Sequence, residues 1–405
     1  MNSCWAARFC FSAAVMSIAS LARAGVWGAQ PVVGVSADYS SNPALLDLPN
    51  TAESHADLLL DAPTTYVGDA FKLSLLPSFR LSNAQGYSSL DSDYEHFNAS
   101  GEFDTERSVL TVTGLLARDS SLYHDYLLNG STGVRRDTAT ADVNWDRHLT
   151  ERLEFDADVN STRVRYAQPA GVSTLTDFKY TSVTPTLAWA DSERGRFTVS
   201  ANAGRYNSLS GAAESTNVNL QLGFAEQLTE IWALSANAGY SRANDVLDAA
   251  EEAVEFTPSG PIVVLLPIRV KSTQNGNIYS VNLSRQTSLL TLSVSASRQL
   301  SPTGYVFLSG QDTYELKATY SKSERWSFSG DVHRINYQNP GAAAAGNGLA
   351  TTSLAFSAAW RWTEQWTLTL NASQVFEHYG SPSIGLSASG ASVELSRQFN
   401  WKSLQ

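Results

Sequence analysis

Short segments in which apolar and polar residues alternate recur along the whole chain. In TEQWTLTLNAS, residues 363–373, apolar side chains occupy every second position from Trp366 to Ala372, with Thr, Asn or Ser between them. A period of two is typical of a β-strand with one apolar and one polar face. Related segments follow Leu149, Leu228 and Ser323. The pattern predicts an all-β protein in which one kind of strand is built many times.

A repeated turn signal separates these segments. A Ser or Thr followed by Glu recurs roughly every 40 residues, at Thr105-Glu106, Thr150-Glu151, Ser192-Glu193, Thr229-Glu230, Ser323-Glu324 and Thr363-Glu364. A degenerate form, Gln286-Thr287-Ser288, fills the one gap in the series. Repeats of this length also occur in propellers and helical solenoids. The period of two, with half-repeats of about 9 to 11 residues that match a membrane-crossing strand, instead predicts one transmembrane hairpin per repeat.

The connections between strands fall into two kinds. Tight turns lie at the Ser/Thr-Glu positions, and long polar loops such as 119–136 and 166–177 lie at the other ends. Bacterial outer-membrane barrels have short periplasmic turns and long external loops. We therefore predict an antiparallel up-and-down transmembrane β-barrel of about 18 strands, with 16 as the main alternative. It would form a single domain over residues 25–405, with a first strand at 31–39 and a last strand near 391–401.

Aromatic residues support the barrel. Eight tryptophans fall near the proposed periplasmic turns or the C-terminus, namely Trp145, Trp189, Trp232, Trp326, Trp360, Trp362, Trp366 and Trp401. Tyrosines gather at the opposite strand ends, namely Tyr39, Tyr94, Tyr166, Tyr206, Tyr240, Tyr279, Tyr314, Tyr337 and Tyr379. Indole and phenol rings prefer the level of the lipid headgroups. Two aromatic belts are less typical of the alternative, a soluble β-sandwich with the apolar faces inside.

The N-terminus predicts export. Arg8 precedes an apolar stretch over residues 9–21, and Ala22-Arg23-Ala24 matches a signal-peptidase site, so residues 1–24 are a predicted signal peptide. No later segment reaches the roughly 20 apolar residues of a membrane helix. Both cysteines lie in this leader, which leaves the exported chain without disulfides or thiolate ligands. The predicted location is the cell outer membrane.

Charge and motif content narrow the function classes. The chain has 39 acidic and 28 basic residues, a formal net charge of −11, which makes nucleic acid an unsuitable partner. The six histidines show no metal-ligand spacing, and no G-x-S-x-G elbow is present. We therefore expect no enzyme activity and no cofactor.

Acidic residues are concentrated on two neighbouring strands. Their positions share the parity of the polar, inward face, and they are Asp142, Asp146, Glu154, Asp156 and Asp158. Such a lumen acidic wall favours cations over anions, although solvated charge without strong selectivity is an equally open reading. Lys72 and Arg80 share inward parity on another strand, and Tyr206 is a candidate platform for sugar stacking.

The longest predicted loop, 244–274, joins an acidic run to the apolar octapeptide PIVVLLPI at 261–268. An exposed apolar octapeptide is an aggregation hazard. The loop could fold into the barrel mouth as a constriction or pair as a short external hairpin. We favour partial occlusion of the mouth.

Several short motifs resemble a known family. They are PVVGVSADYSSNPALL at 31–46, Ser-Arg-Gln at 284–286, 297–299 and 396–398, and the terminal VELSRQFNW at 393–401, which is similar to the signal read by the outer-membrane assembly machinery. Together they resemble porin-like outer-membrane β-barrel proteins found beside exopolysaccharide and PEP-CTERM (exosortase) loci.

The predicted barrel is expected to contact outer-membrane lipid, lipopolysaccharide and the assembly machinery. The resemblance adds exopolysaccharide export components as expected partners. It also implies a role in passing or exporting polysaccharide. Two function classes remain. One is a channel for polysaccharide or small hydrophilic solutes, and the other is a non-conducting barrel that anchors or organises surface material.

Overall fold

The computed structural model describes residues 25–42, 52–85, 94–120, 135–167, 175–257, 260–302, 308–338, 349–379, 384–399 and 401–402. The predicted signal peptide therefore lies outside the described residues. Throughout the described ranges the chain forms antiparallel strands joined by turns and loops, without a helix. No helix in these ranges therefore has the length and apolarity needed to cross a bilayer.

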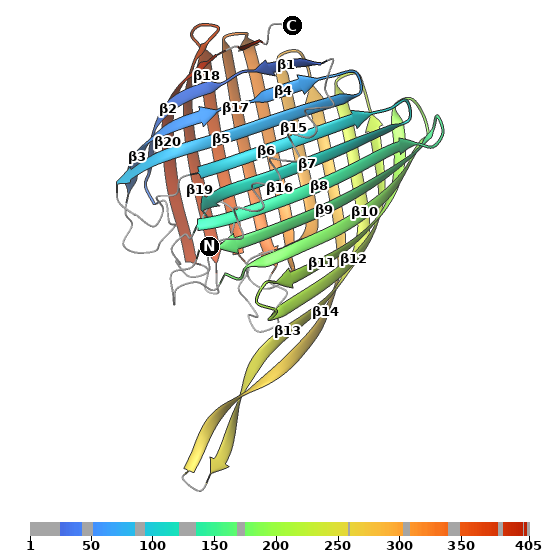
Figure 1. The fold of residues 1–405 in the computed structure, drawn as a ribbon, viewed down its shortest axis with the longest axis vertical. Coiled ribbons are helices and arrows are strands. Elements are labelled where there is room, and N and C mark those ends of the chain that lie inside the picture. Colours follow the sequence, from blue (N-terminus) through green and yellow to red (C-terminus); the bar gives the residue numbers. More distant parts are fainter. Residues whose placement is uncertain are drawn as a thin grey trace.

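The strands follow one another around a single sheet (Figure 1). Their bounds are β1 Val26–Ala29, β2 Val32–Ser40, β3 Glu53–Asp61, β4 Thr64–Val67, β5 Phe71–Gln85, β6 Tyr94–Asp104, β7 Ser108–Ser120, β8 Arg135–His148, β9 Leu153–Tyr166, β10 Phe178–Ala190, β11 Gly195–Ser208, β12 Ala213–Gln227, β13 Trp232–Thr257, β14 Gly260–Gln286, β15 Leu290–Pro302, β16 Leu308–Ser323, β17 Trp326–Gln338, β18 Leu349–Arg361, β19 Trp366–Tyr379, β20 Ile384–Gln398 and β21 Trp401–Lys402. From β5 to β20 consecutive strands pair with each other. At the start of the chain β3 pairs with β2 and β5, and β4 pairs with β1 and β5. The pairing of β2 with β20 closes the barrel.

Three short strands are continuations of longer ones, so the barrel has 18 strands. The pairing Ala29↔Thr64 in β1 and β4 continues the register of Val32↔Asp61 in β2 and β3. The ladder is interrupted because Pro31 and Pro63 lack an N–H donor. Their carbonyls still accept hydrogen bonds, at 2.7 Å from Phe399 N and 3.0 Å from Gln30 N. The first strand thus begins at Val26, five residues before the predicted Pro31.

The repeated Ser or Thr has a structural role in every turn of the series. Its hydroxyl accepts a hydrogen bond from the backbone N–H three residues later, at Thr105 (3.0 Å), Thr150 (3.0 Å), Ser192 (2.9 Å), Thr229 (3.1 Å), Thr287 (2.9 Å), Ser323 (3.3 Å) and Thr363 (3.1 Å). Short hydroxyl side chains favour turns because they can satisfy backbone donors locally. The turn at Thr287 lacks the Glu but keeps this bond, so the hydroxyl and not the carboxylate defines the turn.

The opposite strand ends are less uniform than predicted. The connection between β11 and β12 is only the four residues 209–212, with Gly211 at φ 79°. A left-handed backbone of this kind favours glycine. Long loops therefore occur at this end of the barrel, but not between every pair of strands.

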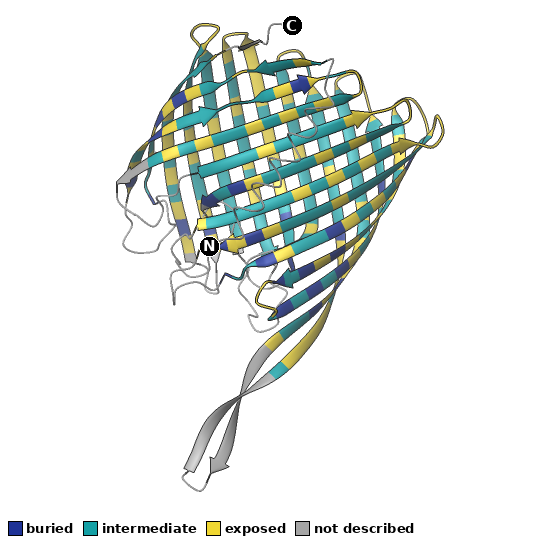
Figure 2. Ribbon diagram, in the orientation of Figure 1, coloured by how far each residue is buried: buried dark blue, intermediate teal, exposed yellow. Residues whose placement is uncertain are grey.

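Apolar side chains cover the outer face of the barrel. Along β12, Val218, Leu220 and Leu222 are 61%, 58% and 63% exposed, and Gln221 between them points inward. Figure 2 shows the same alternation of exposed and less exposed positions along most strands. A water-soluble protein rarely exposes a continuous apolar surface of this extent. The arrangement therefore excludes the soluble sandwich, in which these faces would form a core.

The tryptophans lie at the turn end of the barrel. Trp145, Trp189, Trp326 and Trp362 are 37–62% exposed, and Trp326 stacks on Trp360 with ring centroids 5.6 Å apart. Trp232 and Trp366 begin the strands that follow the turns at Thr229 and Thr363. For Trp401 only the backbone is described, and it pairs with β1.

The predicted tyrosine belt is only partly correct. Tyr39, Tyr240, Tyr279 and Tyr314 have outward parity, whereas Tyr94, Tyr166, Tyr206 and Tyr337 have inward parity, and the side chain of Tyr379 is not described. The prediction used only how near each tyrosine lies to a strand end. It did not use the alternation of side chains along a strand, which decides whether the ring faces lipid or the lumen.

The predicted occlusion of the mouth by loop 244–274 is wrong. This segment belongs to β13 and β14, which pair without interruption from Trp232↔Arg285 to Thr257↔Gly260. Figure 1 shows the two strands leaving the barrel rim as a long ribbon that points away from the lumen. The ladder satisfies the backbone groups that the two strands turn toward each other, and the groups on the outer edges of the ribbon can bond water, so the segment needs no support from the mouth.

Candidate functional site: the barrel lumen

The acidic wall occupies the turn-end half of the lumen on β8 and β9. The structure brings its members together, because Asp146 pairs with Asp156 and Asn144 pairs with Asp158 in the same register. Val143 and Val159, at the intervening positions, face outward and are 37% and 40% exposed. The five carboxylates therefore share one inner surface, and their effect on ion selectivity stays a prediction.

Neighbouring groups neutralise little of this charge. The Asn144 amide donates to Asp156 at 2.6 Å, and His148 Nδ1 lies 3.9 Å from Glu154. Among the described residues, this His148 contact is the wall's one contact with a basic side chain within 4.0 Å, and it is an ion pair only while the imidazole is protonated. Asp146, His148 and Glu154 each offer a ligand atom within 4.8 Å of the others. Acidic groups in such an arrangement are common without a metal, so this proximity does not by itself make a metal site.

A second charged cluster lies on β2, β3 and β5. Asp57 is fully buried, and Arg80 donates to it through both Nε and Nη2. Arg80 Nη2 also reaches Asp38 at 3.3 Å. Ser36 donates to Asp38 at 2.7 Å, and His55 Nε2 lies 3.6 Å from Asp57. The cluster ties three adjacent strands together beside the seam where β2 meets β20.

Asp38, His55 and Asp57 could in principle hold a metal ion. However, the Arg80 guanidinium already contacts both carboxylates of this set. Because a bound cation would have to displace or repel the guanidinium, the arrangement fits an ion-pair network better than a metal centre.

An apolar cluster lies near the loop ends of β9, β10 and β11, on their inward face. Val164, Tyr166, Phe178 and Tyr206 from β9, β10 and β11 form one buried group with Leu175 and with Leu308 of β16. Tyr206 has no exposed surface, and its ring stacks on Phe178 with centroids 5.2 Å apart. Tyr206 is therefore neither the sugar platform nor the upper-belt residue that the sequence suggested.

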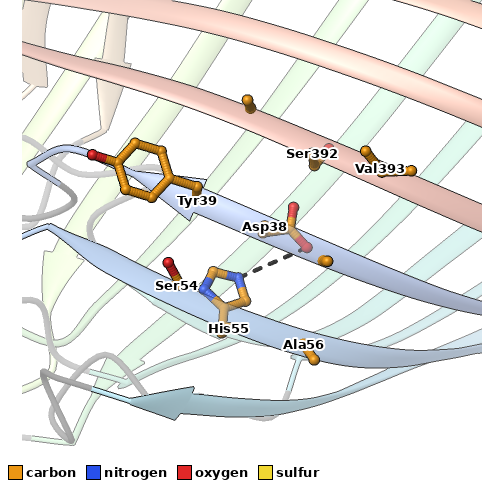
Figure 3. Close-up of a pocket in the computed structure, with 9 residues that line it drawn as sticks. Asp38, Tyr39, Ser54, His55, Ala56, Ser392 and Val393 are labelled. Carbon is orange, nitrogen blue, oxygen red and sulfur yellow. Dashed lines mark ion pairs between the residues drawn. The ribbon is translucent and has the colours of Figure 1, made fainter.

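A hollow of about 410 Å³ lies along β2, β3 and β20. Figure 3 shows Asp38 and His55 facing each other beside it. Most of its lining, including Ala37, Ala56 and Ala391, has outward parity. The hollow is therefore a dent in the outer wall, formed where small side chains meet, and it is not part of the lumen.

Comparisons with known proteins give no family assignment. A scan against protein-family models found no match, and neither did a search of curated proteins. Among solved structures, the chain is similar to OpdQ of Pseudomonas aeruginosa, with 9% identity, TM-score 0.47, and 93% of this chain and 99% of that chain covered.

Two further solved structures are similar to this chain to a comparable degree. OpdK of P. aeruginosa with vanillate has 12% identity, TM-score 0.44, and coverage of 92% of this chain and 99% of that chain. The ferric-catecholate import receptor Fiu of E. coli K12 has 10% identity, TM-score 0.47, and coverage of 91% and 81%. Because these TM-scores lie below 0.5, nothing about solute or mechanism follows from them.

Proposed function

We propose that the protein is an outer-membrane channel of porin-like type for small hydrophilic solutes. The observation that carries the proposal is the closed barrel of 18 strands with exposed Val and Leu side chains outside and polar side chains inside. Barrels of 16 to 18 strands are wide enough to leave an aqueous channel. Transport by diffusion requires a wet lumen and no catalytic residue.

The acidic wall favours cationic or neutral solutes within this proposal. Carboxylates that line a pore attract cations and repel anions. Passage or export of polysaccharide, with the exopolysaccharide and PEP-CTERM connection, is the finer alternative. It has less support, because long sugar polymers are expected to use exposed aromatic platforms in the lumen and Tyr206 is buried.

Planar-bilayer recording tests the channel directly. Refolded protein should give large, stable conductance steps, with a reversal potential in a KCl gradient that indicates cation preference. Replacing Asp142, Asp146, Glu154, Asp156 and Asp158 by Asn or Gln should remove most of that preference while keeping the steps. A set of Gln replacements at Glu106, Glu193, Glu230, Glu324 and Glu364 in the turns is the matched control. A heat-modifiable barrel without steps would reject the channel.

A second candidate function is a non-conducting barrel that anchors surface material. The ribbon of β13 and β14 favours it, because the ribbon projects beyond the rim as a long paired arm. The two functions differ in what removal of residues 249–268 should do. For a channel, we expect unchanged conductance, because the ribbon points away from the lumen. For an anchor, the deletion should release surface material from cells without changing barrel assembly. An increase in conductance after the deletion would instead show that the ribbon constricts the channel.

A further inference from the structure

Three cations meet on the outer wall near the loop ends of β9 and β10. Arg163 and Lys179 are directly paired across the two strands, and Arg165 lies two residues further along β9 on the same face. All three are exposed. Side chains directly opposite in an antiparallel pair have Cβ atoms about 4.5 to 5.5 Å apart, and like charges at that separation destabilise the pair. The sheet therefore has a local repulsion that an anion would relieve.

No carboxylate in the described part of the chain forms an ion pair with Arg163, Arg165 or Lys179. Two carboxylates flank Arg165. Asp137, across the pair with β8, already contacts Arg118 at 3.0 Å and Arg135 at 3.7 Å, and Asp177, two residues before Lys179, accepts a hydrogen bond from Tyr166 N at 2.8 Å. An outward-facing arginine elsewhere on the barrel does have a carboxylate partner. Arg298 of β15 donates two hydrogen bonds, of 2.5 and 2.7 Å, to Asp312 of β16. Within the described ranges, the three cations on β9 and β10 thus form no ion pair.

The three cations lie just above the apolar band. Towards the turn end, β10 presents Val183, Leu187 and Trp189, each 43–48% exposed. Between the band and the cations are the hydroxyls of Ser161 and Thr181, whose oxygens are 3.4 Å apart. This succession of apolar, hydroxyl and cationic groups follows the order of acyl chain, glycolipid headgroup and phosphate in a membrane leaflet.

We propose that Arg163, Arg165 and Lys179 bind the phosphate of lipid A, the phosphorylated glycolipid of lipopolysaccharide, on the outer wall of the barrel. Arginine binds phosphate oxygens through two parallel N–H donors, and lysine adds a point charge. A phosphate monoester carries up to two negative charges. By contrast, the phosphodiester of a zwitterionic phospholipid is offset by its own ammonium group. The site rests on the outer-membrane location proposed above.

Native mass spectrometry of the refolded protein in detergent tests the site. Lipid A with its phosphates should stay bound, and lipid A with the same acyl chains but without phosphates should bind at least about tenfold more weakly. The triple variant Arg163→Gln, Arg165→Gln, Lys179→Gln should lose a similar factor for phosphorylated lipid A. Phosphatidylethanolamine should bind wild type and variant alike.

The matched control removes three positive charges elsewhere. Lys322→Gln, Arg325→Gln and Arg334→Gln change exposed residues on β16, β17 and the turn between them, and should leave lipid A binding unchanged. Equal losses in both triple variants would show that net charge alone attracts the lipid and would overturn the site. Tight binding of inorganic phosphate alone would assign the patch to a free anion and would overturn the lipid assignment. If the triple variant fails to form a heat-modifiable barrel, Arg163→Gln alone serves as the variant.

Failure of this proposal can be told from failure of the channel. Lipid A binding is read in detergent, and conductance is read in phosphatidylcholine bilayers without lipopolysaccharide. Conductance steps without a preference for phosphorylated lipid A would reject the binding site alone. Lipid A preference without steps would reject the channel alone.

Discussion

Replacing Leu222 with Arg should lower the free energy of unfolding by about 2 to 4 kcal/mol, the cost of a cation at the middle of the lipid-facing wall of a barrel. Leu222 is 63% exposed and lies on the outer face near the centre of β12. If that face met water, the same change at such an exposed position would cost no more than about 0.5 kcal/mol. Guanidinium unfolding in phosphatidylcholine vesicles measures the difference.

The matched control is the next residue in the chain. Gln221 has the opposite parity and faces the lumen, so Gln221→Arg should change the unfolding free energy far less than Leu222→Arg. Because the two positions share strand, depth and backbone environment, the contrast isolates the solvent that each face meets. Similar costs at both positions, or a larger cost at Gln221, would contradict a barrel with lipid outside and water inside.

Local patterns made most of the architecture predictable. Alternation of apolar and polar residues specifies strands, and the Ser or Thr hydroxyl that bonds the N–H three residues later specifies the turns between them. Both signals lie within a few residues of sequence. Strand number follows from counting them, and the structure has the predicted 18. The inward parity of the acidic wall was available from the same period of two.

Features set by distant strands could not be read in this way. The sequence placed Arg80 on an inward face but offered no partner, because Asp38 and Asp57 lie on other strands whose register depends on the intervening connections. An external hairpin over residues 244–274 was the alternative and not the favoured prediction, because its apolar octapeptide has no period of two. The pairing of Arg163 with Lys179 was recoverable, since it needed only the hairpin register of β9 and β10.

Removal of Arg80 should destabilise the barrel by about 3 kcal/mol, because it leaves the buried Asp57 carboxylate without its principal donor. Asp57 has no exposed side-chain surface, and Arg80 also contacts Asp38 at 3.3 Å. Arg80→Gln keeps most of the side-chain volume and removes the charge. The measurement is again guanidinium unfolding in lipid vesicles. Lys72→Gln on the same strand and face is the control, because its ion pair with Glu102 is solvent-exposed and should contribute little.

A second substitution distinguishes the buried charge from lost packing. If Arg80→Gln acts by leaving Asp57 charged and unpaired, adding Asp57→Asn should recover much of the lost stability, because the double variant has no buried charge to compensate. If Arg80 mainly contributes packing, the two losses should add. Strict additivity would therefore show that the cluster on β2, β3 and β5 stabilises the barrel by packing and not by charge pairing. Recovery would identify it as the electrostatic link that holds three strands together where the first strand of the barrel meets the last.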